Sequence, residues 1–235
     1  MATTDLDYNL DTNGERTVVQ RLAQLGPKTI FDVGANEGDW SLMVAAEMPE
    51  AQIHAFEIIG ETFLTLNQKV AGREKIVANN FGLFEHSGEL RMHIFDISNK
   101  VASHMPYPHG PGREIICQVR TGDQYMHEKR IEKIDFLKMD VEGAEPNILK
   151  GFSAAIEKEN IDVIQFEYGR VNIMTHFLLY DFYKFLEENG YIVGKIYPDF
   201  VDFRAYDLND EDFLGPNYLA CRRARSDILD LLGGN

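Results

Sequence analysis

The sequence predicts an α/β protein whose core is an open, mostly parallel β-sheet. Apolar and β-branched runs at 29–33, 52–57, 134–140 and 161–167 alternate with segments in which apolar residues recur at helical spacing, which is the pattern of successive β-α units. The first run leads directly into a turn that contains Gly34 and Gly38. With 235 residues and 44% hydrophobic content, the chain can bury one large core, so we expect a single domain over residues 1–235.

The stretch at 29–40, TIFDVGANEGDW, is the centre of this predicted fold. Thr29, Ile30, Phe31 and Val33 suit a buried central strand. The two glycines that follow allow the backbone to turn sharply and to approach a bound molecule. In open α/β sheets, ligands bind outside the carboxyl ends of the strands, near the point where the strand order reverses. This turn is therefore the leading candidate for a cofactor site.

The other elements follow from periodicity and from stop signals. Residues 1–28 should form an N-terminal cap whose helix, 17–25, ends at Gly26-Pro27. The next expected elements are a helix at 39–48, a strand at 52–57, a helix with an apolar face at 63–70 and a strand at 75–78. The last ones are a strand at 134–140, a helix at 145–152, a strand at 161–167, a helix ending at 189–190, and strands at 191–196 and 217–222.

Residues 85–126 interrupt this alternation. Two segments, 89–95 and 114–119, have the composition of strands, and no helical period separates them. Between them, residues 99–112 contain three prolines, two glycines, His104 and His109. Long loops in compact domains are usually functional or disordered. We therefore expect inserted strands that carry a mobile lid over the acceptor side of the site.

Charge and composition exclude several classes of protein. The formal net charge of −15 and the absence of a basic stripe argue against a nucleic-acid partner. The two cysteines, Cys117 and Cys221, lie in apolar segments without metal-ligand or disulfide spacing. The first residues lack the pattern of a secretory signal, and no run of about 18 apolar residues occurs. These features predict a cytoplasmic protein without a membrane partner.

The relation between the first two strands indicates the kind of ligand. Glu57 ends the second strand and follows Asp32 by an interval close to the ~20 residues at which an acid reaches the ribose hydroxyls of a nucleotide. The turn is neither G-x-G-x-x-G nor G-K-[ST], so dinucleotides and triphosphates are disfavoured. Its acids, Asp32, Glu37 and Asp39, with no lysine, suit a positively charged ligand. S-adenosylmethionine, an adenosine with a sulfonium and an ammonium group, meets both conditions.

These residues resemble the FkbM-like family of S-adenosylmethionine-dependent methyltransferases. The resemblance depends on FDVGANEGDWS at 31–41, HAFE at 54–57, GLFEHSG at 82–88 and IDFLKMDVEGAEPNILKG at 134–151. It implies a class I methyltransferase fold, which is Rossmann-like and has a seven-stranded, mostly parallel sheet with an antiparallel last strand. It also implies methylation of a hydroxyl group on a sugar or a secondary metabolite.

The predicted cofactor contacts come from the ends of the first, second, third and fourth main strands. They are Asp32, Gly34, Ala35, Asn36, Glu37, Gly38, Trp40, Glu57, Ile58, Asn80 and Asp140.

The predicted acceptor side consists of acids at two neighbouring strand ends. Asp140 and Glu142 are two residues apart, so their side chains leave the same face of the chain, and Glu167 ends the next strand in the matching place. An alternative is that Glu142 and Glu145 only stabilise the amino end of the following helix. The three acids could also form a Mg²⁺ site. We favour a site without metal, in which the acids bind a neutral, hydroxyl-rich acceptor.

Three residues are candidates for removing the proton of the acceptor hydroxyl, namely Glu142, Asp140 and His104. Glu142, Glu167, His109 and His176 are the predicted acceptor contacts. The predicted function is thus an S-adenosylmethionine-dependent O-methyltransferase that acts on a small hydroxylated molecule. A metal-dependent O-methyltransferase and a catalytically idle cofactor-binding module stay open as alternatives. The oligomeric state also stays open, with a homodimer as one option.

Overall fold

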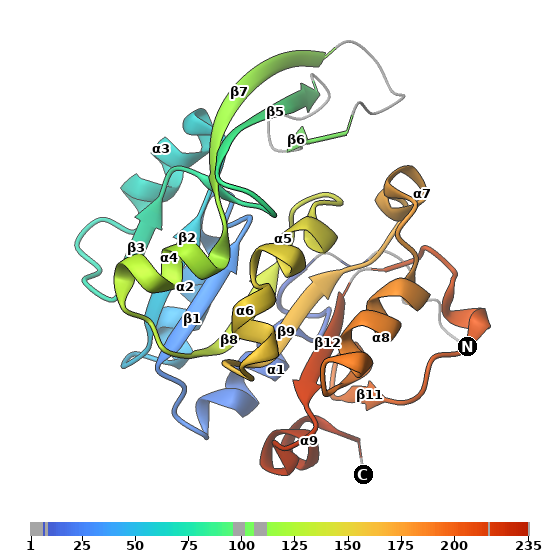
Figure 1. Ribbon diagram of the computed structural model, residues 1–235. Coiled ribbons are helices and arrows are strands. Elements are labelled where there is room, and N and C mark those ends of the chain that lie inside the picture. The colour runs from blue at the N-terminus through green and yellow to red at the C-terminus, as the bar shows by residue number, and fades with distance from the viewer. Residues whose placement is uncertain (1–6, 8, 96–101, 106–111, 216, 235) are drawn as a thin grey trace.

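A computed structural model of the chain describes residues 7, 9–95, 102–105, 112–215 and 217–234 (Figure 1). The helices are α1 (Glu15–Ala23), α2 (Asp39–Glu47), α3 (Gly60–Lys69), α4 (Gly122–Lys129), α5 (Glu145–Gly151), α6 (Ser153–Glu157), α7 (Val171–Thr175), α8 (Leu179–Glu188), α9 (Ser226–Leu232) and the 3-10 helix η1 (Leu208–Asp210). The strands are β1 (Thr29–Val33), β2 (Gln52–Phe56), β3 (Ile76–Asn79), β4 (Gly82–Leu83), β5 (Gly88–Phe95), β6 (Ala102–Ser103), β7 (Gly112–Arg120), β8 (Ile134–Met139), β9 (Ile161–Glu167), β10 (Tyr191–Ile196), β11 (Val201–Phe203) and β12 (Asn217–Arg222).

The main sheet has eight strands in the order β11-β10-β12-β9-β8-β1-β2-β3. The neighbouring strands β3, β2, β1, β8 and β9 pair in parallel. By contrast, β12 is antiparallel to both β9 and β10. The α/β fold and the antiparallel last strand are confirmed. The predicted count of seven strands is wrong by one, because β11 has only 3 residues and shows no period in the sequence. It pairs antiparallel with β10 at the edge of the sheet.

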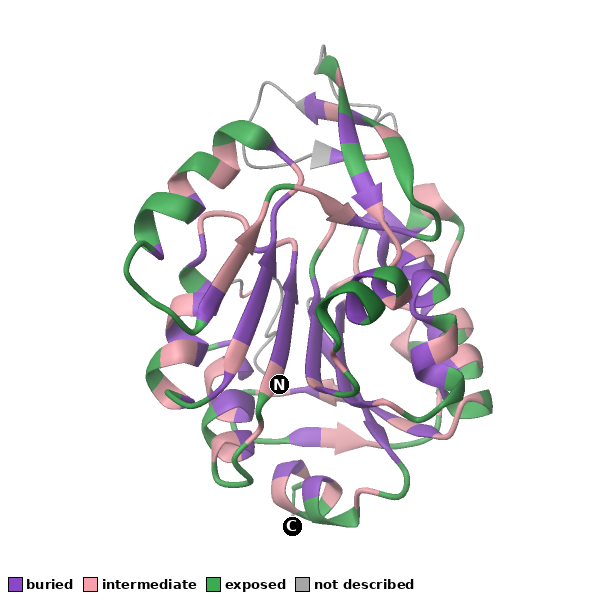
Figure 2. Ribbon diagram, turned by 60° about the vertical axis from the view of Figure 1, so that its left-hand side comes forward, coloured by how far each residue is buried: buried purple, intermediate pink, exposed green. Residues whose placement is uncertain are grey.

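Helices cover both faces of the main sheet (Figure 1). Side chains of α1, α2, α3 and α9 form one hydrophobic cluster with one face, and side chains of α4, α5, α6 and α8 form a second cluster with the other face. The central strands are consequently buried on both sides (Figure 2). This explains why they read as continuous apolar runs and not as alternating ones.

The inserted region forms a second sheet with the order β4-β7-β5-β6. It rises beyond the carboxyl ends of the central parallel strands (Figure 1). The predicted strands at 89–95 and 114–119 are confirmed as the antiparallel pair β5 and β7. As predicted, no helix separates these two strands in the described residues, and α4 begins after β7, where the side chain of Thr121 caps its first turn by accepting a hydrogen bond from the backbone N–H of Gln124. Most of the predicted lid, 99–101 and 106–111, lies outside the described residues.

Apolar and charged contacts hold the second sheet against the rest of the protein. Met92 of β5 packs in one apolar cluster with Ile58 and Ile59, which directly follow β2. On the outer side of this cluster, Arg113 of β7 forms an ion pair with Glu61 of α3 at 2.8 Å. The insertion is thus packed against the end of β2 by apolar side chains as well as by charge.

Both cysteines are buried and free. The longest helices, α3 and α8, have 10 residues each. In the described part of the chain, no helix combines the length and the apolar character that crossing a membrane would require.

Candidate functional site

A cavity of about 300 Å³ opens where the parallel strands end. Its walls come from the N-terminal segment, the β1–α2 turn, the end of β2, the second sheet, and the ends of β8, β9 and β12. Its volume is within the range of small-molecule sites. The lining residues are Leu10, Asn13, Glu15, Val33, Gly34, Ala35, Asn36, Glu37, Asp39, Trp40, Phe56, Glu57, Ile58, Ile59, Gly82, Leu83, Phe84, Leu90, Met92, Lys138, Asp140, Val141, Glu142, Ala144, Glu167 and Asn217.

Glu57 follows the end of β2 and its side chain is held by the backbone. Its Oε2 accepts a hydrogen bond from the N–H of Asn36 at 2.9 Å, and its Oε1 accepts one from the N–H of Ile59 at 2.7 Å. The residue is 6% exposed, and burial raises the pKa of its carboxyl group to about 7. Each oxygen keeps a lone pair for a ligand donor. Apolar side chains of Ile58 and Leu90 line the cavity near it.

The two glycines of the β1–α2 turn have different roles. Gly34 has a φ of 81°, and a side chain at this position would collide with the carbonyl oxygen of Asp140. The absence of a side chain therefore lets the ends of β1 and β8 come together beneath the cavity. Gly38 has a φ of 90°, and a Cβ atom there would lie 2.6 Å from Leu66 of α3. It permits helix packing and does not line the cavity.

A buried polar row crosses the sheet below the cavity. Asp32 on β1 is in register with Lys138 on β8, which is in register with Gln165 on β9. Lys138 donates a hydrogen bond to Asp32 at 3.3 Å, and Ser41 of α2 donates another at 2.6 Å. Gln165 in turn donates to Glu15, the first residue of α1, at 2.7 Å. Asp32 is fully buried and thus supports the site from below.

The predicted acceptor acids are brought together. Asp140, Glu142 and Glu167 all line the cavity. Burial, followed by the nearby charge of Asp140, raises the pKa of Glu142 to about 7. The pKa of Glu167 is raised well above its ordinary value, first by burial and then by the three neighbouring acids Asp140, Glu142 and Glu145. Near neutral pH the carboxyl group of Glu142 can therefore exist in protonated and ionised forms, as a group that donates or accepts protons must.

The loop after β8 is held in an unusual conformation. Glu142 has a φ of 53°, a region that non-glycine residues seldom adopt and that is frequent at functional sites. Its backbone oxygen accepts a hydrogen bond from the hydroxyl of Ser103 on β6 at 3.0 Å. Glu145, which is 1% exposed, accepts a bond from the N–H of Val141 at 3.0 Å. Burial raises the pKa of Glu145 to about 8. This position gives it the role of fixing the loop, and it does not line the cavity.

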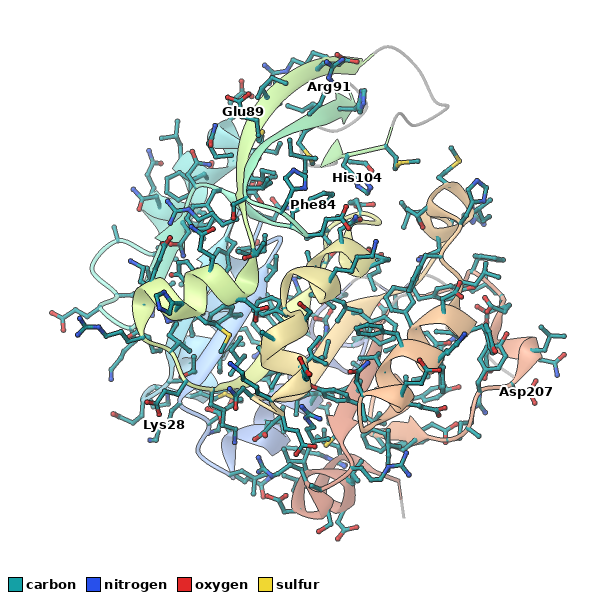
Figure 3. The ribbon with its side chains drawn as sticks, viewed as in Figure 1. Lys28, Phe84, Glu89, Arg91, His104 and Asp207 are labelled. Atoms are coloured by element: carbon teal, nitrogen blue, oxygen red, sulfur yellow. The ribbon has the colours of Figure 1, made fainter. Side chains whose placement is uncertain are left out.

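The predicted histidines lie away from the cavity wall or outside the described residues. The ring of His104 packs on that of Phe84 with centroids 5.7 Å apart, beneath the second sheet (Figure 3). Phe84 lines the cavity, whereas His104 does not. His176 is exposed at the end of α7, and His109 lies outside the described residues. Within the described ranges, no group of three or more His, Cys, Asp or Glu side chains is placed to hold a metal ion.

Among the predicted cofactor contacts, eight line the cavity and three do not. Those that do are Gly34, Ala35, Asn36, Glu37, Trp40, Glu57, Ile58 and Asp140. Asp32 and Gly38 lie behind the wall, as described above. Asn80 donates its side-chain N–H to the backbone oxygen of Glu57 at 2.9 Å and so supports that residue from outside.

Sequence reasoning missed several lining residues. Lys138 gave a signal, because a lysine inside the apolar run IDFLKMD is buried only when it is paired. Glu15 and Asn217 gave none, since they come from opposite ends of the chain and meet through a hydrogen bond of 2.9 Å. Leu90 and Met92 lie in an inserted strand for which no ligand contact was predicted, and they line the wall in one apolar cluster with Ile58.

The acids of the β1–α2 turn attract a cationic ligand less than the sequence suggests. The acids of the turn are paired with lysines from distant elements. Lys69 of α3 lies 3.2 Å from Glu37 and 2.9 Å from Asp39, and Lys138 neutralises Asp32. The excess negative charge in the cavity comes mainly from Glu57, Asp140 and the other acids at the strand ends.

The lining fits an adenosine-type cofactor with a charged tail. The apolar wall can cover a flat base, and Glu57 can accept hydrogen bonds from ribose hydroxyls. Three buried polar atoms of lining residues, Oδ1 of Asn36, Nε1 of Trp40 and Oε2 of Glu167, have no hydrogen-bond partner in the part of the chain that is described. Buried polar groups usually have partners, so a ligand would complete this wall.

The fold is that of the class I, Rossmann-like methyltransferases. Similar structures include precorrin-6y C5,15-methyltransferase from Geobacter metallireducens, with a TM-score of 0.50, 12% identity and coverage of 94% of each chain. A proposed rRNA methylase from Clostridium thermocellum has a TM-score of 0.52 and 10% identity, with coverage of 92% of this chain and 97% of that one. At these identities the likeness shows the fold alone.

The model of the FkbM methyltransferase domain matches residues 32–193, and the chain belongs to this family. The hexuronic acid methyltransferase AglP of Haloferax volcanii is 24% identical over 163 residues. That match covers 68% of this chain and 65% of the relative, less than two thirds of its length. Family membership confirms the predictions of a methyltransferase and of S-adenosylmethionine as its cofactor.

Proposed function

We propose that this methyltransferase acts on a hydroxyl oxygen of a sugar or a sugar-like molecule. The observation that carries the proposal is the division of the cavity into two ends. Glu57 follows β2, whereas Asp140 and Glu142 follow β8 and Glu167 ends β9, on the opposite side of β1 in the strand order, and all four carboxyl groups line the cavity. The first end suits the adenosine part of the cofactor. The second suits an acceptor with several hydroxyl groups, since carboxyl groups accept hydrogen bonds and, when protonated, also donate them.

In this proposal the cofactor is held by the first end and by the turn after β1. Glu57 accepts hydrogen bonds from the ribose hydroxyls, and Ile58 covers the adenine. Gly34, Ala35 and Asn36 present backbone atoms to the methionine part. Asp32, Gly38 and Asn80 act indirectly by holding these groups in place.

The cofactor supplies a methyl group activated on a sulfonium. The residues around it have to place the acceptor oxygen ~3–3.5 Å from that methyl carbon in a dry site, which accounts for most of the acceleration. Glu142 is the group we assign to proton removal. Its pKa of about 7 is close to that of an ideal general base at neutral pH, which contributes roughly 10²–10⁴-fold. The hydrogen bond from Ser103 holds the backbone of Glu142, and His104 does not line the cavity.

The nature of the acceptor is supported by charge and by the relative named above. Glu142, with a pKa of about 7, is partly protonated near neutral pH, and burial favours the neutral form of Glu167 as well, so the site does not repel acidic sugars as strongly as ionised carboxylates would. A hexuronic acid, which the name of the relative indicates for that protein, is therefore an acceptor class to test beside neutral hexoses. The formal net charge of −15 disfavours nucleic acid.

The experiment is methyl transfer to a panel of matched acceptors. Neutral methyl hexosides and the corresponding hexuronides are incubated with the protein and S-adenosylmethionine, and mass spectrometry with NMR locates the new methyl group. We expect an O-methyl ether on a ring hydroxyl. A methyl ester on the carboxyl group, or a methyl on nitrogen or carbon, would contradict the proposal. A parallel reaction with a chelator tests the metal-free mechanism. If the chelator abolished activity and Mg²⁺ restored it, that mechanism would be refuted.

A further inference from the structure

The cavity has a distinctive charge pattern. Seven carboxyl side chains line it, namely Glu15, Glu37, Asp39, Glu57, Asp140, Glu142 and Glu167. Among the described residues, Lys138 is the only basic side chain in this lining. S-adenosylmethionine carries a sulfonium, an ammonium and a single carboxylate. The carboxyl groups of the cavity match the two positive groups, and one positive side chain is available for the one negative group.

Lys138 is held so that it can act as a fixed cation. Its side chain is 6% exposed, and its Nζ lies 3.3 Å from Asp32 and 3.4 Å from Asp140. Burial alone would lower the pKa of this lysine, but the charges of Asp32 and Asp140 outweigh it and raise the pKa above the ordinary value. An ammonium group has three N–H donors. Two aspartates leave one donor for a ligand.

Trp40 provides a second donor beside this cation. The Nζ of Lys138 lies 5.5 Å from the centroid of the Trp40 ring. Trp40 also lines the cavity and is 4% exposed. Its Nε1–H has no acceptor among the residues that the structure describes, although a buried tryptophan N–H usually finds one. One carboxylate could accept hydrogen bonds from both side chains.

We propose that Lys138 and Trp40 bind the α-carboxylate of the methionine part of S-adenosylmethionine. The carboxylate pairs with the Lys138 ammonium as an ion pair in a nearly dry site, where such pairs are strong. Asp140, the cavity-facing partner of Lys138, is then placed beside the α-ammonium group, at the boundary with the acceptor acids Glu142 and Glu167. The inference extends the proposed cofactor site and does not depend on the identity of the acceptor.

The test compares two ligands that differ in the amino-acid part. S-adenosylhomocysteine has the α-carboxylate and the α-ammonium, whereas 5′-methylthioadenosine has neither and keeps the adenosine and the thioether. Their dissociation constants are measured by calorimetry for the wild-type protein and for Lys138→Gln. We expect the variant to bind S-adenosylhomocysteine at least tenfold more weakly and to bind 5′-methylthioadenosine with unchanged affinity. Trp40→Phe should show a smaller change in the same direction.

Lys133→Gln is the matched control. Lys133 also pairs with two aspartates, Asp135 at 3.6 Å and Asp162 at 2.6 Å, but it immediately precedes β8 and therefore lies at the amino end of that strand, away from the cavity. The control should bind both ligands as the wild type does.

Two further measurements keep the inference open to refutation if Lys138→Gln unfolds. The double variant Asp32→Asn/Lys138→Gln removes both members of the buried pair. It should also bind S-adenosylhomocysteine more weakly than the wild type and 5′-methylthioadenosine with unchanged affinity. For the wild-type protein, S-adenosylhomocysteine should also bind at least tenfold more tightly than its analogue without the carboxylate. The inference about Lys138 would be overturned if the variant bound both ligands equally more weakly, bound neither ligand more weakly, or changed only the KM for the acceptor. These results would leave the cofactor site itself standing. Failure of the wild type to bind either ligand would refute the cofactor site as well.

Discussion

Replacing Glu57 with glutamine gives the most direct test of the cofactor end. Glu57 has a pKa of about 7 because it is buried, and ribose hydroxyls need its ionised form as an acceptor. One pH unit below the pKa, removing the proton before binding costs about 1.4 kcal/mol. The wild-type affinity for S-adenosylhomocysteine should therefore fall about tenfold between pH 8 and pH 6. At pH 8, Glu57→Gln should weaken binding by about 1.5–3 kcal/mol, the range for hydrogen bonds to charged groups.

The assay is calorimetry with S-adenosylhomocysteine, whose neutral thioether disturbs the acceptor-side acids less than a sulfonium does. The wild type and the variant are compared at both pH values, because other groups also titrate and only the difference in slope belongs to Glu57. An analogue without the ribose 2′-hydroxyl separates lost contacts from a displaced turn: removal of the hydroxyl should weaken wild-type binding much more than variant binding. Equal affinities of wild type and variant at pH 8, or equal slopes with pH, would refute the ribose assignment.

Three other variants test the acceptor end. Glu142→Gln should lower turnover at least tenfold and remove the rise of activity with pH near 7, with little change in the affinity for S-adenosylhomocysteine. An unchanged pH profile would contradict the role of Glu142 as the general base. Ser103→Ala should lower turnover several-fold with unchanged cofactor affinity, since only the hydrogen bond to the backbone of Glu142 is lost. The carboxyl group of Glu145 holds its proton more strongly in the folded than in the unfolded protein, because its pKa is about 8 in the folded state and 4.5 ordinarily. The free energy of unfolding therefore falls as pH rises through this range. Glutamine cannot ionise, so thermal melting should show Glu145→Gln more stable than wild type at pH 8 and equal to it near pH 4.5.

The sequence predicts the main sheet well because burial on both faces leaves a strong local signal. The strands β1, β8 and β9 are mainly apolar, and each is followed by a turn or helix start that propensity also favours. The acid that ends β2 is visible for a different reason, since its distance from β1 is fixed by the length of one β-α-β unit. Such features can be recognised from residues that lie close together in the sequence.

The features that the sequence does not reveal depend on register between distant strands. Asp32, Lys138 and Gln165 form one buried row only because β1, β8 and β9 align at those positions. The contact of Glu15 with Asn217 joins the first helix to the last strand. Periodicity carries no information about such pairings. For the same reason, the pairing of the turn acids with Lys69 and Lys138 could not be foreseen.

The acids at the acceptor end also link methyl transfer to proton transfer. In the proposed mechanism, Glu142 and Glu167 would lie near the sulfonium of bound S-adenosylmethionine, and that positive charge would be lost when the methyl group leaves. A nearby positive charge favours the ionised carboxyl group, and its loss favours the protonated one. With a pKa of about 7, Glu142 could respond to such a change near neutral pH. Loss of the charge would therefore assist Glu142 in taking the proton of the acceptor hydroxyl, and Glu142 would release that proton to water before the next turnover.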